Sequence, residues 1–303
     1  MNGASRGSGW GTLWSLILVL VLVMVPMTEA TAKRNNRDPR LSAGNGWELK
    51  FRDEFNGTAL DERKWTTAFP WGRDRSSVGE LQYYAPDAFS LGNGVLRILA
   101  TPSPGGTHSY DSGLISSHAS FAQQYGRYEI RSRLPRGTGL WPAFWLLPPD
   151  TSWPPEIDVF EALGQEPDSV NMTVHWSKAG EHRQNGARYT GPNFSRGFHT
   201  FAVEWGPDTL VWFVDGVERH RVRGHSPQGP MYVLANLAVG GSWPGAPDAS
   251  TSFPASFDID YIRVYAAKTA PAAEDGKTSP GRKDGDGDGD GEGGRRQRNG
   301  RAR

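Results

Sequence analysis

The sequence predicts an all-β fold, a sandwich of two packed antiparallel sheets, from three observations. Residues 128–134 read Tyr-Glu-Ile-Arg-Ser-Arg-Leu, in which apolar and charged side chains alternate as in a half-buried strand. The runs 211–214 and 217–222 flank Asp215-Gly216, a strong hairpin turn signal. The chain also contains 38 glycines and 22 prolines, which break long helices. Short strands with frequent turns favour two packed sheets.

The N-terminal residues 1–32 have the features of an export signal. Arg6 precedes an apolar run over residues 13–25, and Ala30-Thr31-Ala32 has the small-x-small form of a signal peptidase site. The alternative is an uncleaved membrane anchor, although the apolar run is shorter than the ~20 residues that a spanning helix usually needs. Residues 33–44 are expected to be a linker.

Residues 45–267 are long enough to bury the core of one domain, so no second domain is required. Residues 268–303 are rich in Gly, Asp and Arg and almost lack apolar residues, which predicts a disordered tail. Its Asp-Gly repeat over residues 284–290 resembles a calcium loop, but an EF-hand beginning at Asp284 would need Glu where Arg295 stands. A solvated tail and loose cation or polymer contact both stay open.

The charge balance limits the partners that the protein attracts, and the lack of cysteine limits how it can be stabilised. Basic and acidic residues number 33 each, so no global field attracts nucleic acid. There is no cysteine, so disulfides cannot stabilise the protein despite its expected export. We expect a secreted or extracytoplasmic monomer without stable membrane insertion after signal cleavage.

The stretch Glu156-Ile157-Asp158-Val159-Phe160-Glu161 places three acids among strand-forming residues, where acids are normally depleted. Side chains alternate along a strand, so Glu156 and Asp158 share a face that Glu161 would not. A β-bulge at Val159-Phe160 would bring Glu161 to that face, and bulges are common next to active sites. The alternative is a strand edge with solvated acids.

Three acids on one surface suit glycoside hydrolysis. That reaction needs two carboxyl groups astride a sugar–sugar bond, about 5–5.5 Å apart if one attacks the anomeric carbon and wider if a water fits between them. Asp158 could hydrogen-bond Glu156, and its charge would help a neighbouring acid keep its proton.

The surrounding motifs resemble glycoside hydrolase family 16, the laminarinases, lichenases and related β-glucan hydrolases. The run Trp141-Pro142-Ala143-Phe144-Trp145 and the segment Trp153-Pro154-Pro155 lead into the acids. The resemblance covers residues 45–266, and its other motifs lie at 47–55, 80–84, 112–117, 125–129, 174–176, 198–201, 212–216, 236–241 and 259–265.

The resemblance implies a β-jelly roll with a concave sheet forming a sugar cleft, and a retaining mechanism. Carried onto this chain, Glu156 is the nucleophile, Glu161 the acid/base and Asp158 an assisting group. The spacing of two residues between Asp158 and Glu161 is similar to that in laminarinases, whereas lichenases have one residue fewer there. Pro155, where many laminarinases have Gly, is similar to the bacterial branch that trims acidic exopolysaccharides such as succinoglycan.

The expected function is therefore that of a secreted retaining endo-β-glycanase, which hydrolyses internal β-1,3 or β-1,3/1,4 glucosidic bonds by double displacement. Transglycosylation stays undecided, because an acceptor sugar can replace water. The alternatives are a depolymerase of a succinoglycan-like exopolysaccharide, a non-catalytic glucan-binding module and a surface adhesin. The binding module is disfavoured because such relatives typically lose a catalytic Glu and this chain retains both.

Twelve tryptophans invite a carbohydrate interpretation, since flat aromatic faces pack on sugar C–H faces. Alternating apolar neighbours predict burial for four of them: Trp47, Trp65, Trp205 and Trp212. Trp141 and Trp243 are expected in the cleft, while cleft and core are both open for Trp145 and Trp176. Glu80 and Gln82 bind hydroxyls or end a surface strand, and Asn236 is a binding residue by its motif.

His175 follows Glu161 by fourteen residues, which fits the neighbouring strand of the same sheet. It could hydrogen-bond Glu161 or a sugar hydroxyl, or be structural. His118, His199 and His220 show no metal-ligand spacing, so a catalytic zinc site is not expected. No cofactor is required; the resemblance implies that a structural calcium ion would use Asp260 as its acid.

Overall fold

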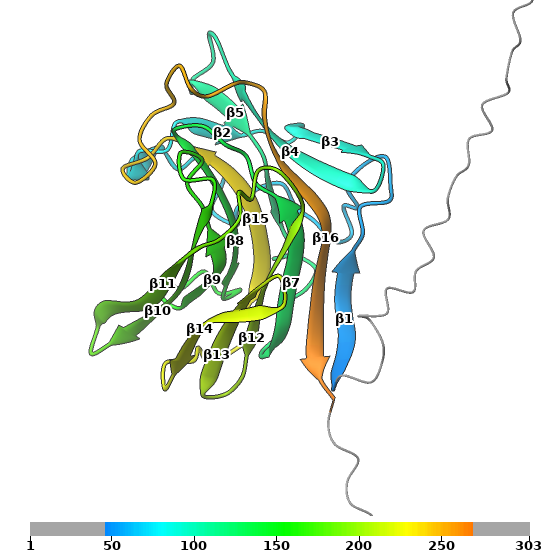
Figure 1. The fold of residues 1–303 in the computed structure, drawn as a ribbon, viewed down its shortest axis with the longest axis vertical. Coiled ribbons are helices and arrows are strands. Elements are labelled where there is room, and N and C mark those ends of the chain that lie inside the picture. Colours follow the sequence, from blue (N-terminus) through cyan, green and yellow to red (C-terminus); the bar gives the residue numbers. More distant parts are fainter. Residues whose placement is uncertain (1–45, 269–303) are drawn as a thin grey trace, which may run out of the picture. The chain divides into compact units, whose positions relative to one another are not determined.

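The computed structural model describes residues 46–268, which form two β-sheets that pack face to face (Figure 1). The expected signal segment 1–32, the linker 33–44 and the tail beyond residue 268 lie outside the described residues. Besides strands, the described region contains the short 3-10 helix η2 (Ser76–Val78).

The larger sheet has ten strands in the order β14-β13-β12-β7-β16-β4-β5-β2, with β1 paired to β16 and β3 to β4. Its strands are β1 (Trp47–Asp53), β2 (Gln82–Tyr84), β3 (Phe89–Gly92), β4 (Val95–Pro102), β5 (Tyr110–Ser112), β7 (Gly126–Arg133), β12 (His199–Trp205), β13 (Thr209–Val214), β14 (Val217–Arg223) and β16 (Ala255–Ala267).

The smaller sheet has six strands in the order β11-β10-β9-β8-β15-β6. They are β6 (Leu114–Ser116), β8 (Leu140–Leu147), β9 (Glu156–Glu161), β10 (Ser169–Lys178), β11 (Glu181–Thr190) and β15 (Tyr232–Val239). The pairings are antiparallel except between β2 and β5, which run parallel. The all-β sandwich expected from the sequence is thus confirmed.

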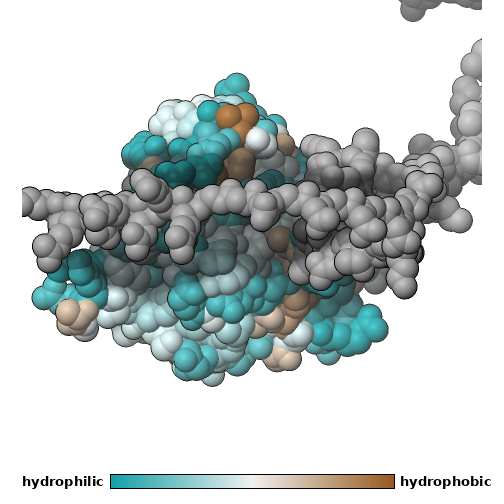
Figure 2. All heavy atoms as spheres, turned by 90° about the horizontal axis from the view of Figure 1, so that it is seen from below, coloured by the Kyte–Doolittle hydropathy of each residue, from teal (hydrophilic) through white to brown (hydrophobic). Residues whose placement is uncertain are grey.

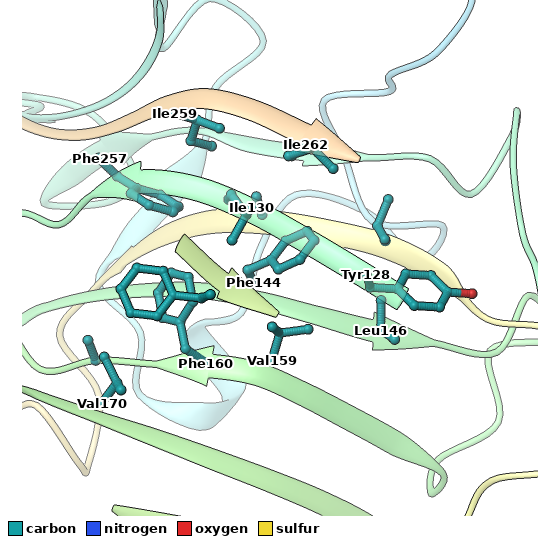
Figure 3. Close-up of a cluster of buried hydrophobic side chains, with 14 of the residues drawn as sticks. Tyr128, Ile130, Phe144, Leu146, Val159, Phe160, Val170, Phe257, Ile259 and Ile262 are labelled. Atoms are coloured by element: carbon teal, nitrogen blue, oxygen red, sulfur yellow. The ribbon is translucent and has the colours of Figure 1, made fainter. Parts of the chain in front are cut away.

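The hydrophobic core lies between the two sheets (Figure 3). The larger sheet contributes side chains from β7 and β16, and the smaller sheet contributes side chains from β8, β9 and β10; they include Tyr128, Ile130, Phe257, Ile259, Ile262, Phe144, Leu146, Val159, Phe160 and Val170. Burying this much apolar surface is the main source of stability for a domain without disulfides.

Two local predictions are confirmed. Strand β7 alternates between buried and partly exposed residues along its length, as the pattern of residues 128–134 indicated. The hairpin of β13 and β14 turns at Asp215 and Gly216, with φ of 51° and 77°. Two consecutive positive φ values are what a tight hairpin turn requires, and Asp-Gly tolerates them.

Burial of the tryptophans follows the prediction at three of four positions. Trp65, Trp205 and Trp212 are at most 2% exposed. Trp47 is only partly buried, so the prediction of core burial is wrong there. Trp47 is the first residue of β1, an edge strand that pairs with β16 alone. A neighbouring strand therefore covers it on one side only.

Strand β9 contains the predicted bulge. Asp158 pairs with Thr173 and Glu161 with Asn171, so three steps along β9 match two along β10. On the other side, Asp158 and Phe160 oppose adjacent residues of β8. Val159 and Phe160 are consequently both buried in the core, at 2% and 0% exposure, although they are neighbours in sequence.

Apolar atoms on the visible face of the described residues form small separate groups within a mostly hydrophilic surface (Figure 2). Among the residues that the structure describes, five large hydrophobic side chains are exposed: Trp71, Val78, Trp153, Val217 and Trp243. Within residues 46–268, no helix has the length and apolar character that crossing a membrane requires.

Candidate active site

A cleft of about 540 Å³ lies on the outer face of the smaller sheet. Side chains from β8, β9, β10, β11 and β15 form its floor, and residues 69–84 form one wall. The cleft thus crosses several neighbouring strands, which gives an elongated ligand several places to bind.

The three acids of β9 line this cleft together. Ile157, Val159 and Phe160 point into the core, so Glu156, Asp158 and Glu161 are left on the opposite face. Asp158 is only 2% exposed, and the two glutamates are partly exposed. The bulge is therefore the local feature that brings the third acid to the first two.

A tryptophan of the other sheet fixes the bulge. The indole N–H of Trp212, on β13, donates to the backbone carbonyl of Asp158 at 2.8 Å. Bulges leave backbone groups without ladder partners, and a buried carbonyl without a hydrogen bond is costly. Sequence analysis assigned Trp212 to the core but missed this contact, because no spacing pattern links the two positions.

Each glutamate accepts a hydrogen bond from a tryptophan. Trp153 Nε1 donates to Glu156 Oε2 at 3.0 Å, and Trp141 Nε1 donates to Glu161 Oε1 at 3.1 Å. Trp141 is also packed edge-on against Trp243, with ring centroids 5.5 Å apart. The two carboxyl groups are therefore each oriented by an N–H donor.

His175 lies on β10 directly opposite Glu156, as its spacing suggested. Its Nε2 is 3.0 Å from Asp158 Oδ2 and 3.7 Å from Glu156 Oε1. The suggestion that it hydrogen-bonds Glu161 is wrong, because the register places His175 at the Glu156 end of β9 while Glu161 faces Asn171.

Burial raises the pKa values of all three acids. The pKa of Asp158 rises to about 7 and that of Glu156 to about 8, in both cases mainly through desolvation. The pKa of Glu161 lies well above its ordinary value because burial is reinforced by the charges of Asp158 and Glu156. His175 opposes the rise at Glu156. A raised pKa lets Glu161 keep its proton at a higher pH than an ordinary carboxyl group would.

These shifts predict a pH-dependent cost to stability. The folded-state pKa of Glu156 exceeds its ordinary value of 4.5, so wild-type stability falls as pH rises from about 4.5 to about 8. Glu156→Gln should therefore raise the melting temperature relative to wild type by roughly 3 °C or more at pH 8, and by much less at pH 4.5. Differential scanning calorimetry across this range checks it. Glu62→Gln, at an exposed acid, is the control; a gain for Glu156→Gln that is the same at every pH would contradict the linkage.

A second polar cluster lies around Asn236 on β15, two strands from the acids of β9. Glu80 Oε2 accepts hydrogen bonds from Gln82 at 2.6 Å and from the hydroxyl of Tyr84 at 3.2 Å. Asn236 donates to the Tyr84 hydroxyl at 2.9 Å and accepts from Trp145 Nε1 at 2.8 Å. This chain of bonds fixes the polar groups that face the ligand.

Most of the predicted binding residues meet at the cleft, and two do not. Those that line it are Glu80, Trp141, Trp145, His175, Asn236 and Trp243. Gln82 is fully buried behind the wall, where its side chain bonds Glu80 and the backbone N–H of Val239. Trp176 is instead stacked on His225, with centroids 4.1 Å apart.

Sequence analysis missed one side of the wall. Trp71 stacks on Phe69 with centroids 4.8 Å apart, and the Arg75 guanidinium lies 5.5 Å from the Phe69 ring centre. Phe69, Arg75 and Tyr84 all line the cleft. The available signal was an aromatic pair within a Pro- and Gly-containing stretch, Phe69-Pro70-Trp71-Gly72.

Comparison with known proteins agrees with this site. The family model "Glycosyl hydrolases family 16" matches residues 82–263, more than half of the chain. The chain belongs to glycosyl hydrolase family 16. This family supplies the fold and the class of reaction that the motifs indicated.

Among family 16 relatives, an endo-1,3-1,4-beta-glycanase of Rhizobium meliloti (strain 1021) is 38% identical over 240 residues, covering 71% of this chain and 51% of the relative. A beta-glucanase of Rhodothermus marinus is 36% identical, covering 72% of this chain and 85% of the relative. The chain thus spans about half the length of the first relative.

Solved family 16 structures have the same fold. The laminarinase catalytic domain of Thermotoga maritima MSB8 matches with a TM-score of 0.66 and 34% identity, covering 74% of this chain and 99% of that one. The endo-beta-1,3-glucanase of Pyrococcus furiosus matches with a TM-score of 0.66 and 36% identity, covering 74% and 96%.

Two places in this family 16 domain bear on metal binding. Ligand atoms of Glu156, Asp158 and His175 lie within 4.8 Å of one another, but their hydrogen bonds to one another and to Trp153 already employ them. Asp260 Oδ2 accepts a hydrogen bond from Arg131 at 2.5 Å. Its carboxylate is paired with a guanidinium, so the side chains around it fit a calcium site poorly.

Proposed function

We propose that this protein is a retaining endo-β-glycanase that hydrolyses internal β-1,3 or β-1,3/1,4 glucosidic bonds by double displacement. The observation that carries the proposal is the bulged strand β9, which presents Glu156, Asp158 and Glu161 to one cleft. The names of two relatives, an endo-1,3-1,4-beta-glycanase and a beta-glucanase, support the same bond types.

In the first step, the Glu156 carboxylate attacks the anomeric carbon while Glu161 gives its proton to the leaving glycosidic oxygen. The high pKa of Glu161 supports this role, because the group keeps its proton until the leaving oxygen needs it. The Trp153 N–H orients Glu156 and favours its charged form. A covalent glycosyl-enzyme and a shortened chain result.

In the second step, Glu161 acts as a base and takes a proton from water, which attacks the anomeric carbon and releases Glu156. Asp158 assists in both steps: its charge raises the pKa values of both glutamates, and His175 holds it by a hydrogen bond. A sugar hydroxyl that replaces water would give transglycosylation.

The cleft supports a polymeric substrate. Trp141, which bonds Glu161, and its neighbour Trp243 offer aromatic surfaces in the cleft, and Glu80 with Asn236 offers partners for sugar hydroxyls. A second candidate is an acidic exopolysaccharide of the succinoglycan kind. Arg75 and Arg188 line the cleft and favour it, although Glu80 and Glu166 neutralise part of their charge.

Product analysis on a panel of polysaccharides tests the function. We expect laminarin, mixed-linkage glucan or succinoglycan to be shortened internally, and agarose and carrageenan to stay intact. Proton NMR during the first minutes should show the newly formed reducing end as the β anomer, because two displacements restore the configuration. The α anomer as first product would contradict the retaining mechanism, and intact polymers throughout would contradict hydrolysis.

Export belongs to the same proposal. We infer that residues 1–32 direct secretion, which N-terminal sequencing of the exported protein tests: an N-terminus near residue 33 supports cleavage. A structural calcium ion at Asp260 is not part of the proposal, because Arg131 already pairs with that carboxylate. Its ion pair with Arg131 predicts that excess chelator leaves the melting temperature unchanged.

A further inference from the structure

A histidine outside the cleft lining contacts the groups that hold both Glu156 and Asp158. His182 lies on β11 opposite Ser177, two residues from His175 along β10 and therefore on the same face of the sheet. Its Nε2 is 2.9 Å from His175 Nδ1, and the two rings are stacked with centroids 5.2 Å apart.

The His182 ring also packs against Trp153, with centroids 4.8 Å apart. Trp153 is 56% exposed, so the core does not hold its indole; the two histidine rings beside it do. His182 thus contacts Trp153, which donates to Glu156, and His175, which bonds Asp158.

The two bonds of His175 restrict where its proton lies. An ionised Asp158 can only accept, so this contact is a hydrogen bond only in the tautomer of His175 that carries its proton on Nε2. A neutral imidazole then has an unprotonated Nδ1, which can only accept, and burial favours the neutral ring of His175. The matching donor at Nδ1 is the Nε2–H of His182.

We propose that His182 is a positioning residue for the reaction: by donating to His175 Nδ1 it selects the tautomer of His175 that donates to ionised Asp158. The inference rests on the proposed hydrolysis and extends it to a residue that touches no reacting group. Because His182 is exposed, its replacement should leave the fold intact.

Three substitutions separate the hydrogen bond from the ring contact. His182→Phe keeps an aromatic ring against Trp153 and lacks the donor, His182→Gln keeps an N–H donor and lacks the ring, and His182→Ala lacks both. We expect kcat on β-glucan to fall about 3- to 10-fold in the Phe and Ala variants, the worth of one hydrogen bond, with KM unchanged. The Gln variant should keep more than half of the wild-type kcat.

The control is Arg183→Ala on the same hairpin, whose side chain pairs with Glu181 and does not line the cleft. It should leave kcat unchanged, and melting temperatures of all four variants should agree with wild type. A Phe variant as active as wild type, a Gln variant as impaired as Ala, or an equal loss in Arg183→Ala overturns the proposal.

Nitrogen-15 NMR of the imidazoles tests the same claim without substrate. We expect His175 to be protonated on Nε2 and not on Nδ1 in wild type and in His182→Gln, and to become a tautomer mixture in His182→Phe. Protonation on Nδ1 in wild type overturns the proposal. If wild type hydrolyses no glycan, the proposed function fails, and this measurement still decides the role of His182.

Discussion

Glu156→Ala is expected to abolish hydrolysis of β-glucan while the protein stays folded. The substitution removes the carboxylate that would form the covalent intermediate. We expect kcat to fall by roughly four orders of magnitude or more, the size seen when a covalent nucleophile is deleted. Reducing-end release from laminarin or mixed-linkage glucan measures the loss.

Azide tests the role assigned to Glu156. A small anion can enter the space that the lost carboxylate leaves and attack the anomeric carbon of an activated aryl β-glycoside. Only one displacement then takes place, so the product should be the α-glycosyl azide. Glu62→Ala, at an exposed acid, should behave as wild type. Absence of azide rescue in Glu156→Ala, together with rescue in Glu161→Ala, would reverse the two roles.

The sequence alone was sufficient to predict the bulge in β9. Side chains alternate along a strand, so Glu161 would lie on the face opposite Glu156 and Asp158 unless one residue is inserted. The insertion buries two consecutive residues, and Val159 and Phe160 are both apolar, as that burial requires. The fold class followed from the same kind of local pattern. Such predictions succeed where the physical constraint lies within a few neighbouring residues.

Contacts between distant segments could not be predicted in this way. Trp212 supports the bulge from the other sheet, 54 positions along the chain, and no local pattern identifies its partner. Gln82 is a polar side chain in a strand end and gave no sign that it would be fully buried behind Glu80. His182 lies in an exposed polar strand, and only the register between β10 and β11 shows that it lies next to His175.

Glu161→Ala should slow hydrolysis most for substrates whose leaving group must be protonated. Natural glucan has a poor leaving group that must receive a proton, so we expect the variant to lose about 10²- to 10⁴-fold in kcat/KM on it. An aryl glycoside with an acidic phenol leaves without a proton, so formation of the covalent intermediate should be nearly as fast as in wild type. Pre-steady-state release of the phenol measures that step.

The pH dependence gives a second, independent signature of Glu161. Its raised pKa means that wild type keeps the proton as pH rises and loses activity only when Glu161 ionises, so kcat/KM on glucan should fall at the alkaline side. In Glu161→Ala acting on the aryl glycoside, that alkaline fall should disappear because no proton is donated. If the alkaline fall persists unchanged in the variant, another group is the acid. The variant could also lose its activity on the aryl glycoside to the same extent as its activity on glucan. That result would point to a damaged site, because losing the acid alone cannot slow the departure of a group that needs no proton.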